Sequence, residues 1–187
     1  MAGSVYASYW LLKALYAIDS DHGDLALEML TQCDTNSWCH MLREGATCVM
    51  EAWSRQGKPN LSWSHPWASA PASAITWGFM GIQPTSPGFK TFSFQPQPGN
   101  VSRASITVPT LSGFIRATLE QNVGKGMRVT LAAPASTLAS VCLPKYQLAG
   151  AQLVVDGVAT AGRAQGNYVC VDDVGSKAVP RVISRGE

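Results

Sequence analysis

Tryptophan is concentrated in one stretch of this 187-residue sequence. Five of its six tryptophans lie within forty residues, namely Trp38, Trp53, Trp63, Trp67 and Trp77. Trp38 and Trp77 occur at helical spacing, which favours core positions. The other three flank polar loops, and an aromatic face beside a cleft is a surface on which the C–H face of a sugar stacks. Trp53, Trp63 and Trp67 are therefore candidate carbohydrate-binding residues.

Glu51 is the acid whose surroundings most favour chemistry. It lies within the apolar run Thr47–Trp53, where a lone carboxylate costs free energy unless it has a partner. Burial raises the pKa of such a carboxyl and a charged partner lowers it, and either change suits general acid/base catalysis. The structural alternative is a glutamate that bonds to a nearby serine or to the backbone.

Glycoside hydrolysis normally uses two carboxyl groups, one on each side of the scissile bond. Asp19, Asp21, Asp24 and Asp34 fit turn or cap positions, and Glu28 fits a solvated helix position. Glu44 precedes Glu51 by seven residues, about 10 Å along a continuous helix, but Gly45 is expected to break that helix. Only Glu51 therefore remains as a credible catalytic carboxylate.

The first part of the chain has helical periodicity. We expect helices from about Ser4, over Leu25–Cys33 with Asp24 as N-cap, over Trp38–Arg43 with Thr35, Asn36 or Ser37 as cap, and over Trp67–Met80. The first helix is apolar around most of its circumference, so it requires neighbours on more than one side. A loop over Ser54–Pro66 carries Trp63 and follows Glu51.

From Gln83 onward, prolines, glycines and short alternating segments predict strands. The expected strands are Lys90–Gln95, Ala104–Val108, Phe114–Leu119, Met127–Ala132, Ser140–Leu143, Gln152–Val155 and Tyr168–Val171. Their regular spacing is typical of a β-sandwich. We therefore expect an α+β chain, with a helical domain over residues 1–82 and an antiparallel β-sandwich over residues 83–187.

Composition excludes several classes of protein. Charged residues make up 14% and the net charge is +2, without the basic cluster of a nucleic-acid-binding protein. The longest apolar stretch, Ala74–Ile82, is far shorter than the roughly 20 residues of a membrane span. The N-terminal residues lack the basic region of a signal peptide. We expect no metal, no cofactor, no nucleic acid and no membrane as partners.

The five cysteines follow no metal-binding spacing. They are Cys33, Cys39, Cys48, Cys142 and Cys170. We interpret them as ordinary buried thiols, while a disulfide between Cys142 and Cys170 remains open. Asn60–Ser62 and Asn100–Ser102 have the form of N-glycosylation acceptors, which favours an extracellular protein without establishing its compartment.

Three motifs, in order and at compatible spacing, resemble the C-terminal part of the α-L-rhamnosidases of glycoside hydrolase family 78. They are Gly45–Trp53, Asn60–Trp67 and Gly81–Lys90. The stretch Thr107–Ile115 and the strands around it resemble the C-terminal β-sandwich of the same family. The resemblance spans residues 4–155.

This resemblance implies the end of an (α/α)6 catalytic barrel followed by a β-sandwich, and hydrolysis of terminal α-L-rhamnosides with inversion. It assigns the general base to Glu51 and a sugar contact near the reacting carbon to His65. Trp53, Trp63 or Trp67 would then form walls of the pocket. The expected substrate is a rhamnose-containing glycoside or polysaccharide.

The acid-rich segment that carries the general acid in this family has no counterpart in the sequence. One hypothesis is therefore that the chain supplies the general base and acts only together with a missing N-terminal barrel segment or an oligomeric partner. The alternative is a stand-alone carbohydrate-binding or structural remnant without catalytic activity. Translation of the coding DNA upstream of Met1 would discriminate between these hypotheses.

Overall fold

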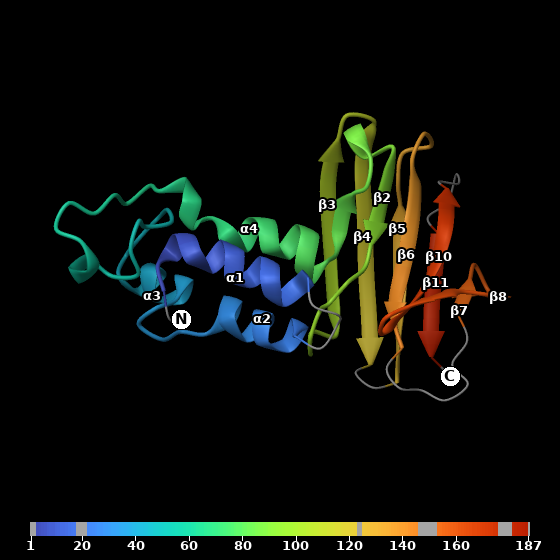
Figure 1. The fold of residues 1–187 in the computed structure, drawn as a ribbon, viewed down its shortest axis with the longest axis horizontal. Helices are drawn as coiled ribbons and strands as arrows, with labels where there is room; N and C mark the ends of the chain where they lie inside the picture. The colour runs from blue at the N-terminus through green and yellow to red at the C-terminus, as the bar shows by residue number, and fades with distance from the viewer. Residues whose placement is uncertain (1–2, 18–21, 123–124, 146–152, 176–180, 187) are drawn as a thin grey trace. The chain divides into compact units, whose positions relative to one another are not determined.

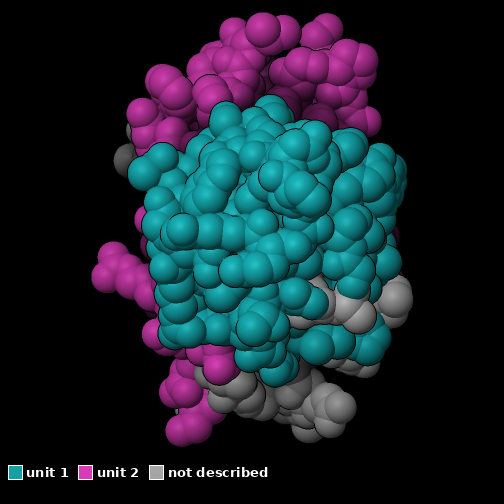
Figure 2. Space-filling view, turned by 90° about the vertical axis from the view of Figure 1, so that its left-hand side faces the viewer, with its two compact units in different colours: residues 1–79 teal, residues 80–187 magenta. Residues whose placement is uncertain are grey.

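The computed structural model describes residues 3–17, 22–122, 125–145 and 153–175, and the backbone of residues 181–186. The chain forms two compact units, Met1–Phe79 and Met80–Glu187 (Figures 1 and 2). The first unit is helical, and the second consists of strands and the short 3₁₀ turn η4 (Pro87–Phe89) among its described residues. The α+β class expected from the sequence is thereby confirmed.

The first unit contains four α-helices and short turns of other helical types among its described residues. The α-helices are α1 (Val5–Ala17), α2 (Gly23–Thr31), α3 (Trp38–Arg43) and α4 (Ala70–Ala74). The other turns are η1 (Arg55–Gly57), η2 (Pro66–Ala68) and the π-helical η3 (Ile75–Phe79). Helix α1 packs against α2 and α4, and the three helices lie side by side in Figure 1.

Helix α1 buries one of its apolar faces and exposes another. Leu12 and Leu15 are buried in the core of the unit. Tyr6 and Trp10, on another side of the helix, are 46% and 53% exposed. Because the helix is apolar on both sides, its sequence alone does not show which side meets α2 and α4.

Helix α3 has the bounds expected from the sequence, and Ser37 is its N-cap. The Ser37 hydroxyl accepts a 3.0 Å hydrogen bond from the backbone N–H of His40, which satisfies one of the free donors of the first turn. Helix α2 begins at Gly23, one residue before the expected cap, so Asp24 lies in its first turn. There its negative charge interacts favourably with the positive end of the helix dipole.

The long helix expected over Trp67–Met80 is divided. The 3₁₀ turn η2 comes first, α4 begins at Ala70 with Pro71 in its first turn, and the π-helical turn η3 follows. A Cβ atom on Gly78 would lie 2.3 Å from the ring of Tyr16. The absence of a side chain at Gly78 thus permits a close approach of backbone and ring.

The second unit contains two sheets. Their strand orders are β1-β2-β6-β10-β9 and β3-β4-β5-β11-β7-β8. The strands are β1 (Ile82–Pro84), β2 (Thr91–Phe94), β3 (Arg103–Thr110), β4 (Gly113–Asn122), β5 (Gly126–Ala132), β6 (Leu138–Pro144), β7 (Leu153–Val155), β8 (Val158–Thr160), β9 (Arg163–Gln165), β10 (Tyr168–Gly175) and β11 (Arg181–Gly186). Side chains alternate between buried and more exposed positions along β2 and β5, as expected where two sheets pack face to face.

All seven expected strands are present, within a few residues at each end; Gln152, the first residue of one of them, lies outside the described residues. The sequence did not predict β1, β8, β9 or β11, of which the first three have only three residues each. The expectation of wholly antiparallel sheets needs one correction, because β2 pairs with β6 in parallel. The hairpins β3–β4 and β4–β5 are antiparallel.

The interpretation of the cysteines as ordinary thiols is wrong for four of the five. Disulfides join Cys33 to Cys39 and Cys142 to Cys170, whereas Cys48 is free and exposed. Cys142 and Cys170 face each other on the paired strands β6 and β10. Register between distant strands decides this pairing, and a count of cysteines does not contain that information.

Among the described residues, none of the helices has both the length and the apolar character needed to cross a lipid bilayer. The same part of the chain contains no group of three or more His, Cys, Asp or Glu side chains arranged to hold a metal ion.

Candidate active site

Two segments of the helical unit lie side by side and bring Glu51 close to the loop that carries His65. The backbone N–H of Glu51 donates to the carbonyl of Ser62 at 3.0 Å, and the N–H of His65 donates to the carbonyl of Val49 at 2.9 Å. Residues that are more than ten positions apart in the sequence are thereby held in register. The motif around Glu51 and the motif around His65 form one local structure.

The carboxylate of Glu51 is bound through both of its oxygens. Oε1 accepts a hydrogen bond from Lys58 Nζ, and Oε2 accepts one from the backbone N–H of Ser62 at 3.1 Å. The side chain is 15% exposed. The sequence predicted a partner for this acid, and the structure shows two.

These contacts keep Glu51 ionised. The hydrogen bond from Lys58 is the largest cause that lowers the pKa of the Glu51 carboxyl, and the N–H of Ser62 is the next. Partial burial acts in the opposite direction, and coulombic interactions with Lys58 and His65 add smaller reductions of the pKa. A carboxylate that is ionised near neutral pH can accept a proton, so this environment favours a base over an acid.

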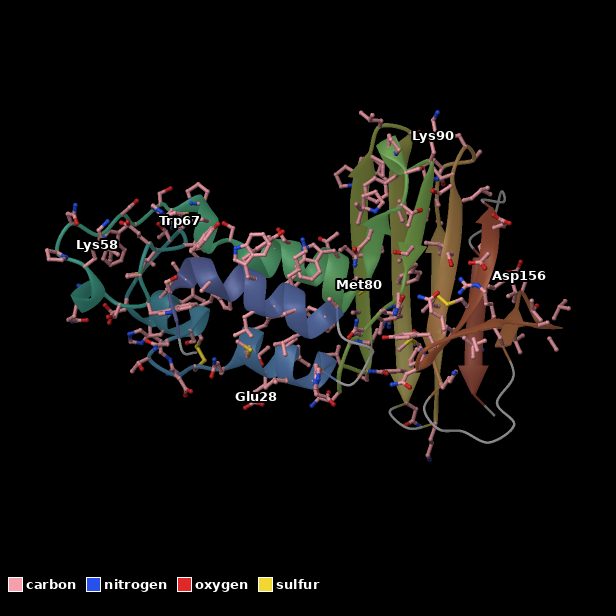
Figure 3. All side chains as sticks on the ribbon, viewed as in Figure 1. Glu28, Lys58, Trp67, Met80, Lys90 and Asp156 are labelled. Carbon is pink, nitrogen blue, oxygen red and sulfur yellow. A yellow bond between two sulfur atoms is a disulfide. The ribbon has the colours of Figure 1, made fainter. Side chains whose placement is uncertain are left out.

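His65 and Trp67 form a ring cluster next to this loop. Their ring centroids are 4.4 Å apart, and the ring of Trp67 lies 5.1 Å from that of Tyr6 on helix α1. Trp67 is 50% exposed. Lys58 and Trp67 are both labelled in Figure 3, on the part of the unit formed by the long loop.

Trp63 is 40% exposed. The guanidinium carbon of Arg55 lies 5.4 Å from its ring centroid, and Arg55 also pairs with Glu44 at 3.0 Å. Glu44, the C-cap of α3, is thus engaged in an ion pair of its own, and His40 in α3 lies 3.7 Å from its carboxylate. These contacts give Glu44 a structural role between Arg55 and the end of α3.

Trp53 lies in the core. It is 7% exposed, and its indole N–H donates to the carbonyl of Gly3 at 2.8 Å. Its ring meets that of Trp38 edge to face, with centroids 5.2 Å apart. This position favours a packing role for Trp53, whereas Trp63 and Trp67 are 40% and 50% exposed.

Sequence reasoning did not single out Lys58, Arg55 or Tyr6. The sequence contained a signal for Lys58 and Arg55, because both are basic residues of the loop that directly follows Glu51. Tyr6 had no comparable signal, since its contact with Trp67 depends on how helix α1 packs against the turn η2.

Comparison with known proteins assigns both the helical unit and the β unit to one family of glycoside hydrolases. Residues 1–78 match the model of the bacterial alpha-L-rhamnosidase 6 hairpin glycosidase domain, and residues 81–156 match that of the bacterial alpha-L-rhamnosidase C-terminal domain. The chain belongs to the alpha-L-rhamnosidase family and corresponds to the C-terminal part of its members.

A curated relative is the alpha-L-rhamnosidase of Streptomyces avermitilis, 27% identical over 134 residues. The match covers 67% of this chain and 13% of the relative, so the chain spans only a small part of that protein's length. The crystal structure of a Streptomyces avermitilis alpha-L-rhamnosidase complexed with L-rhamnose is similar with a TM-score of 0.74 and 26% identity, over 95% of this chain and 17% of that one.

The fold is also that of the alpha-L-rhamnosidase from Dictyoglumus thermophilum. The TM-score is 0.84 at 17% identity, over 98% of this chain and 21% of the other. Both units of the chain therefore have counterparts in a solved rhamnosidase structure.

Proposed function

We propose that this chain carries the general-base part of an inverting α-L-rhamnosidase site, with Glu51 as the base. In an inverting reaction, a carboxylate removes a proton from the attacking water on the face opposite the leaving group. The second carboxyl group, the general acid, protonates the leaving oxygen and stands roughly 6.5–9.5 Å from the base. The substrate would be a terminal α-L-rhamnoside.

The observation that carries this proposal is the pair of contacts on Glu51. The Lys58 ammonium and the Ser62 N–H hold the carboxylate in one orientation and lower its pKa. Each carboxylate oxygen has a second lone pair, so the group can still accept a hydrogen bond from water. A charged, oriented and partly exposed carboxylate is what a general base requires.

We assign the sugar contacts to His65, Trp63 and Trp67. The backbone bond between His65 and Val49 places the imidazole on the segment next to Glu51. The ring of Trp67 lies beside that of His65 at a tilt, and Trp67 is 50% exposed. Trp63 is 40% exposed, with Arg55 over its ring. Trp53 would support these residues from the core and would not touch the sugar.

The general acid would come from another part of the protein. The described acids of the helical unit besides Glu51 are Asp24, Glu28, Asp34 and Glu44. Of these, Glu44 pairs with Arg55, and Asp24 and Glu28 lie in helix α2. The chain covers 13–21% of the length of the rhamnosidases described above. We therefore infer that the complete site forms when further helices of the six-hairpin domain, or an oligomeric partner, cover this unit.

The test is Glu51→Gln in protein that includes the rest of the six-hairpin domain, assayed with p-nitrophenyl α-L-rhamnopyranoside. Loss of a general base is expected to lower kcat by about 10²–10⁴-fold. Proton NMR during hydrolysis by the unsubstituted protein should show the β-anomer of rhamnose first, as inversion requires. Glu28→Gln is the matched control, because it removes an acid that is exposed on helix α2.

Azide distinguishes a base from a residue needed only for folding. Azide is an anion that attacks the anomeric carbon without losing a proton, so it bypasses the base and should give β-rhamnosyl azide with Glu51→Ala protein. Full activity of Glu51→Gln, or α-rhamnose as the first product, would remove Glu51 from this role.

The exposed indoles also support a second candidate function, carbohydrate binding without catalysis. Trp63 and Trp67 would act in either case. Binding of a rhamnoside that is unaffected by Glu51→Gln, together with absence of hydrolysis in the longer protein, would favour this alternative.

A further inference from the structure

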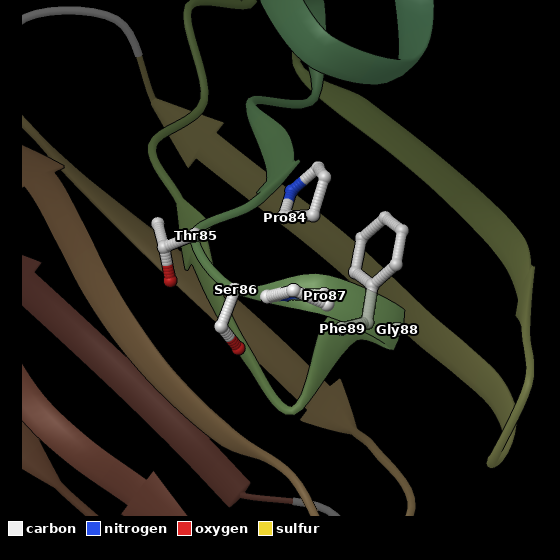
Figure 4. Close-up of a pocket in the computed structure, with 6 residues that line it drawn as sticks. All are labelled: Pro84, Thr85, Ser86, Pro87, Gly88 and Phe89. Atoms are coloured by element: carbon white, nitrogen blue, oxygen red, sulfur yellow. The ribbon is translucent and has the colours of Figure 1, made fainter.

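A hollow of about 560 Å³ lies where the chain turns from β1 to β2 in the second unit. It is lined by the continuous segment Pro84–Phe89 (Figure 4). The hollow is shallow and largely open to solvent, so a ligand would lie against its lining and not inside an enclosed cavity. None of the residues that we assigned to the rhamnosidase site belongs to it.

The turn that lines the hollow is held rigidly by its own hydrogen bonds. The N–H of Thr85 donates to the carbonyl of Thr91 at 3.0 Å, and the N–H of Thr91 donates to the Ser86 hydroxyl at 2.8 Å. The hydroxyls of Thr85 and Thr91 lie 2.7 Å apart. The shape therefore exists before any ligand arrives, which reduces the conformational entropy lost on binding.

Phe89 holds an unfavourable backbone conformation in this turn. Its φ is 59°, directly after Gly88 at 69°. For an L-residue with a side chain, the left-handed region is unfavourable, and bulky residues rarely occupy it. The ring packs partly on Phe92, with centroids 6.3 Å apart. Such outliers cluster where a side chain serves a ligand.

The lining offers two kinds of surface and no charge. The rings of Pro84, Pro87 and Phe89 lie on one side, and Thr85 and Ser86 lie on the other (Figure 4). A charged ligand would lose its hydration without meeting an opposite charge. A sugar ring matches both surfaces, because its C–H face stacks on hydrocarbon and aromatic rings while its hydroxyls bind side-chain hydroxyls.

We propose that this hollow is an accessory binding site for a neutral sugar residue with an apolar face. A 6-deoxy sugar such as L-rhamnose fits this description. The choice of rhamnose rests on the proposed function of the helical unit. The site would hold a branch of the substrate on the β unit and would take no part in bond cleavage.

The test is an NMR titration of the ¹⁵N-labelled 187-residue chain with methyl α-L-rhamnopyranoside. The amide signals of Thr85, Ser86, Gly88 and Phe89 should shift together with a Kd on the order of 1 mM, the affinity of a few weak contacts. Shifts confined to Glu51–Trp67 would leave the proposed function intact and overturn the accessory site. Absence of any shift at residues 85–89 would also overturn it.

Phe89→Gly is the informative variant. It removes the ring and relieves the left-handed backbone, so the unit should stay folded while the Kd rises at least tenfold. Phe114→Ala is the control, because Phe114 is 53% exposed in the same unit but does not line the hollow. An unchanged Kd in Phe89→Gly, or an equal loss in Phe114→Ala, would contradict the proposal.

Discussion

Lys58 Nζ forms an ion pair with Oε1 of Glu51 across the loop that separates them in the sequence. The lysine side chain is 39% exposed and the glutamate side chain 15%. The cation thus lies at the surface and the carboxylate further inside. Lys58 therefore both orients Glu51 and determines the pH range over which it is charged.

Lys58→Met is expected to raise the pKa of Glu51 toward its ordinary value of about 4.3, since the largest cause of the lowered pKa is removed. A base must be deprotonated to act, so the acidic limb of the rate–pH profile should move to higher pH. Carbon-13 NMR of the Glu51 carboxyl in the 187-residue chain measures the same pKa without any assay of activity. Lys58→Arg keeps the charge and serves as the control.

The same ion pair links stability to pH. A carboxyl whose pKa is lowered by folding stabilises the folded state above its unfolded pKa, and this contribution is lost as the pH falls through the folded pKa. Below pH 5, urea unfolding should therefore show a weaker decline of stability with falling pH in Lys58→Met than in the unsubstituted chain. Identical pH dependence in the two proteins would show that the ion pair does not form in solution.

Removing the disulfide that closes the longer loop should lower the free energy of unfolding more than removing the other. Cys142 and Cys170 are separated by 28 residues, and Cys33 and Cys39 by 6. In the chain-entropy account, the first contributes about 3–4 kcal/mol and the second about 2 kcal/mol. Denaturant unfolding of Cys142→Ala/Cys170→Ala and of Cys33→Ala/Cys39→Ala measures both contributions. A larger effect of the shorter loop would contradict this account, and Cys48→Ala is the control for the loss of a thiol.

Gly78→Ala should destabilise the helical unit by about 1–3 kcal/mol, the usual range for overpacking. The added methyl group would lie 2.3 Å from the Tyr16 ring, within the distance of a steric clash. In an unobstructed helix the same change would instead stabilise by roughly 0.5–1 kcal/mol. The sign of the change in thermal stability therefore tests the contact. When Tyr16 is replaced by alanine, Gly78→Ala should no longer destabilise the unit and should instead stabilise it.

The exposed apolar face of α1 should drive association of the isolated chain. Tyr6, Trp10 and Leu11 are 46%, 53% and 39% exposed, and apolar residues grouped in this way favour contact with a partner. Trp10→Glu should shift the chain toward the monomer in light scattering at micromolar concentration. Ala14→Glu adds the same charge to an exposed position of α1 without removing a ring. A monomeric chain before substitution would argue against a covering partner.

Much of the local structure was determined by the sequence alone. Ser37 and Trp38–Arg43 specify a cap and a helix within one short segment, and alternating apolar residues in β2 and β5 specify half-buried strands. These are local effects of backbone hydrogen bonding and side-chain periodicity, so neighbouring residues contain the information. Glu51 could be singled out for the same reason, because a lone acid in an apolar run is visible without a structure.

Tertiary structure decided the contacts between residues distant in the sequence. The pairing of Lys58 with Glu51, the parallel alignment of β2 with β6 and the disulfide between Cys142 and Cys170 depend on which segments meet. Packing also decided that Trp53 lies in the core, while Trp63 and Trp67 remain exposed, although all three flank similar loops. Burial depends on neighbours from the whole unit, and local composition does not specify those neighbours.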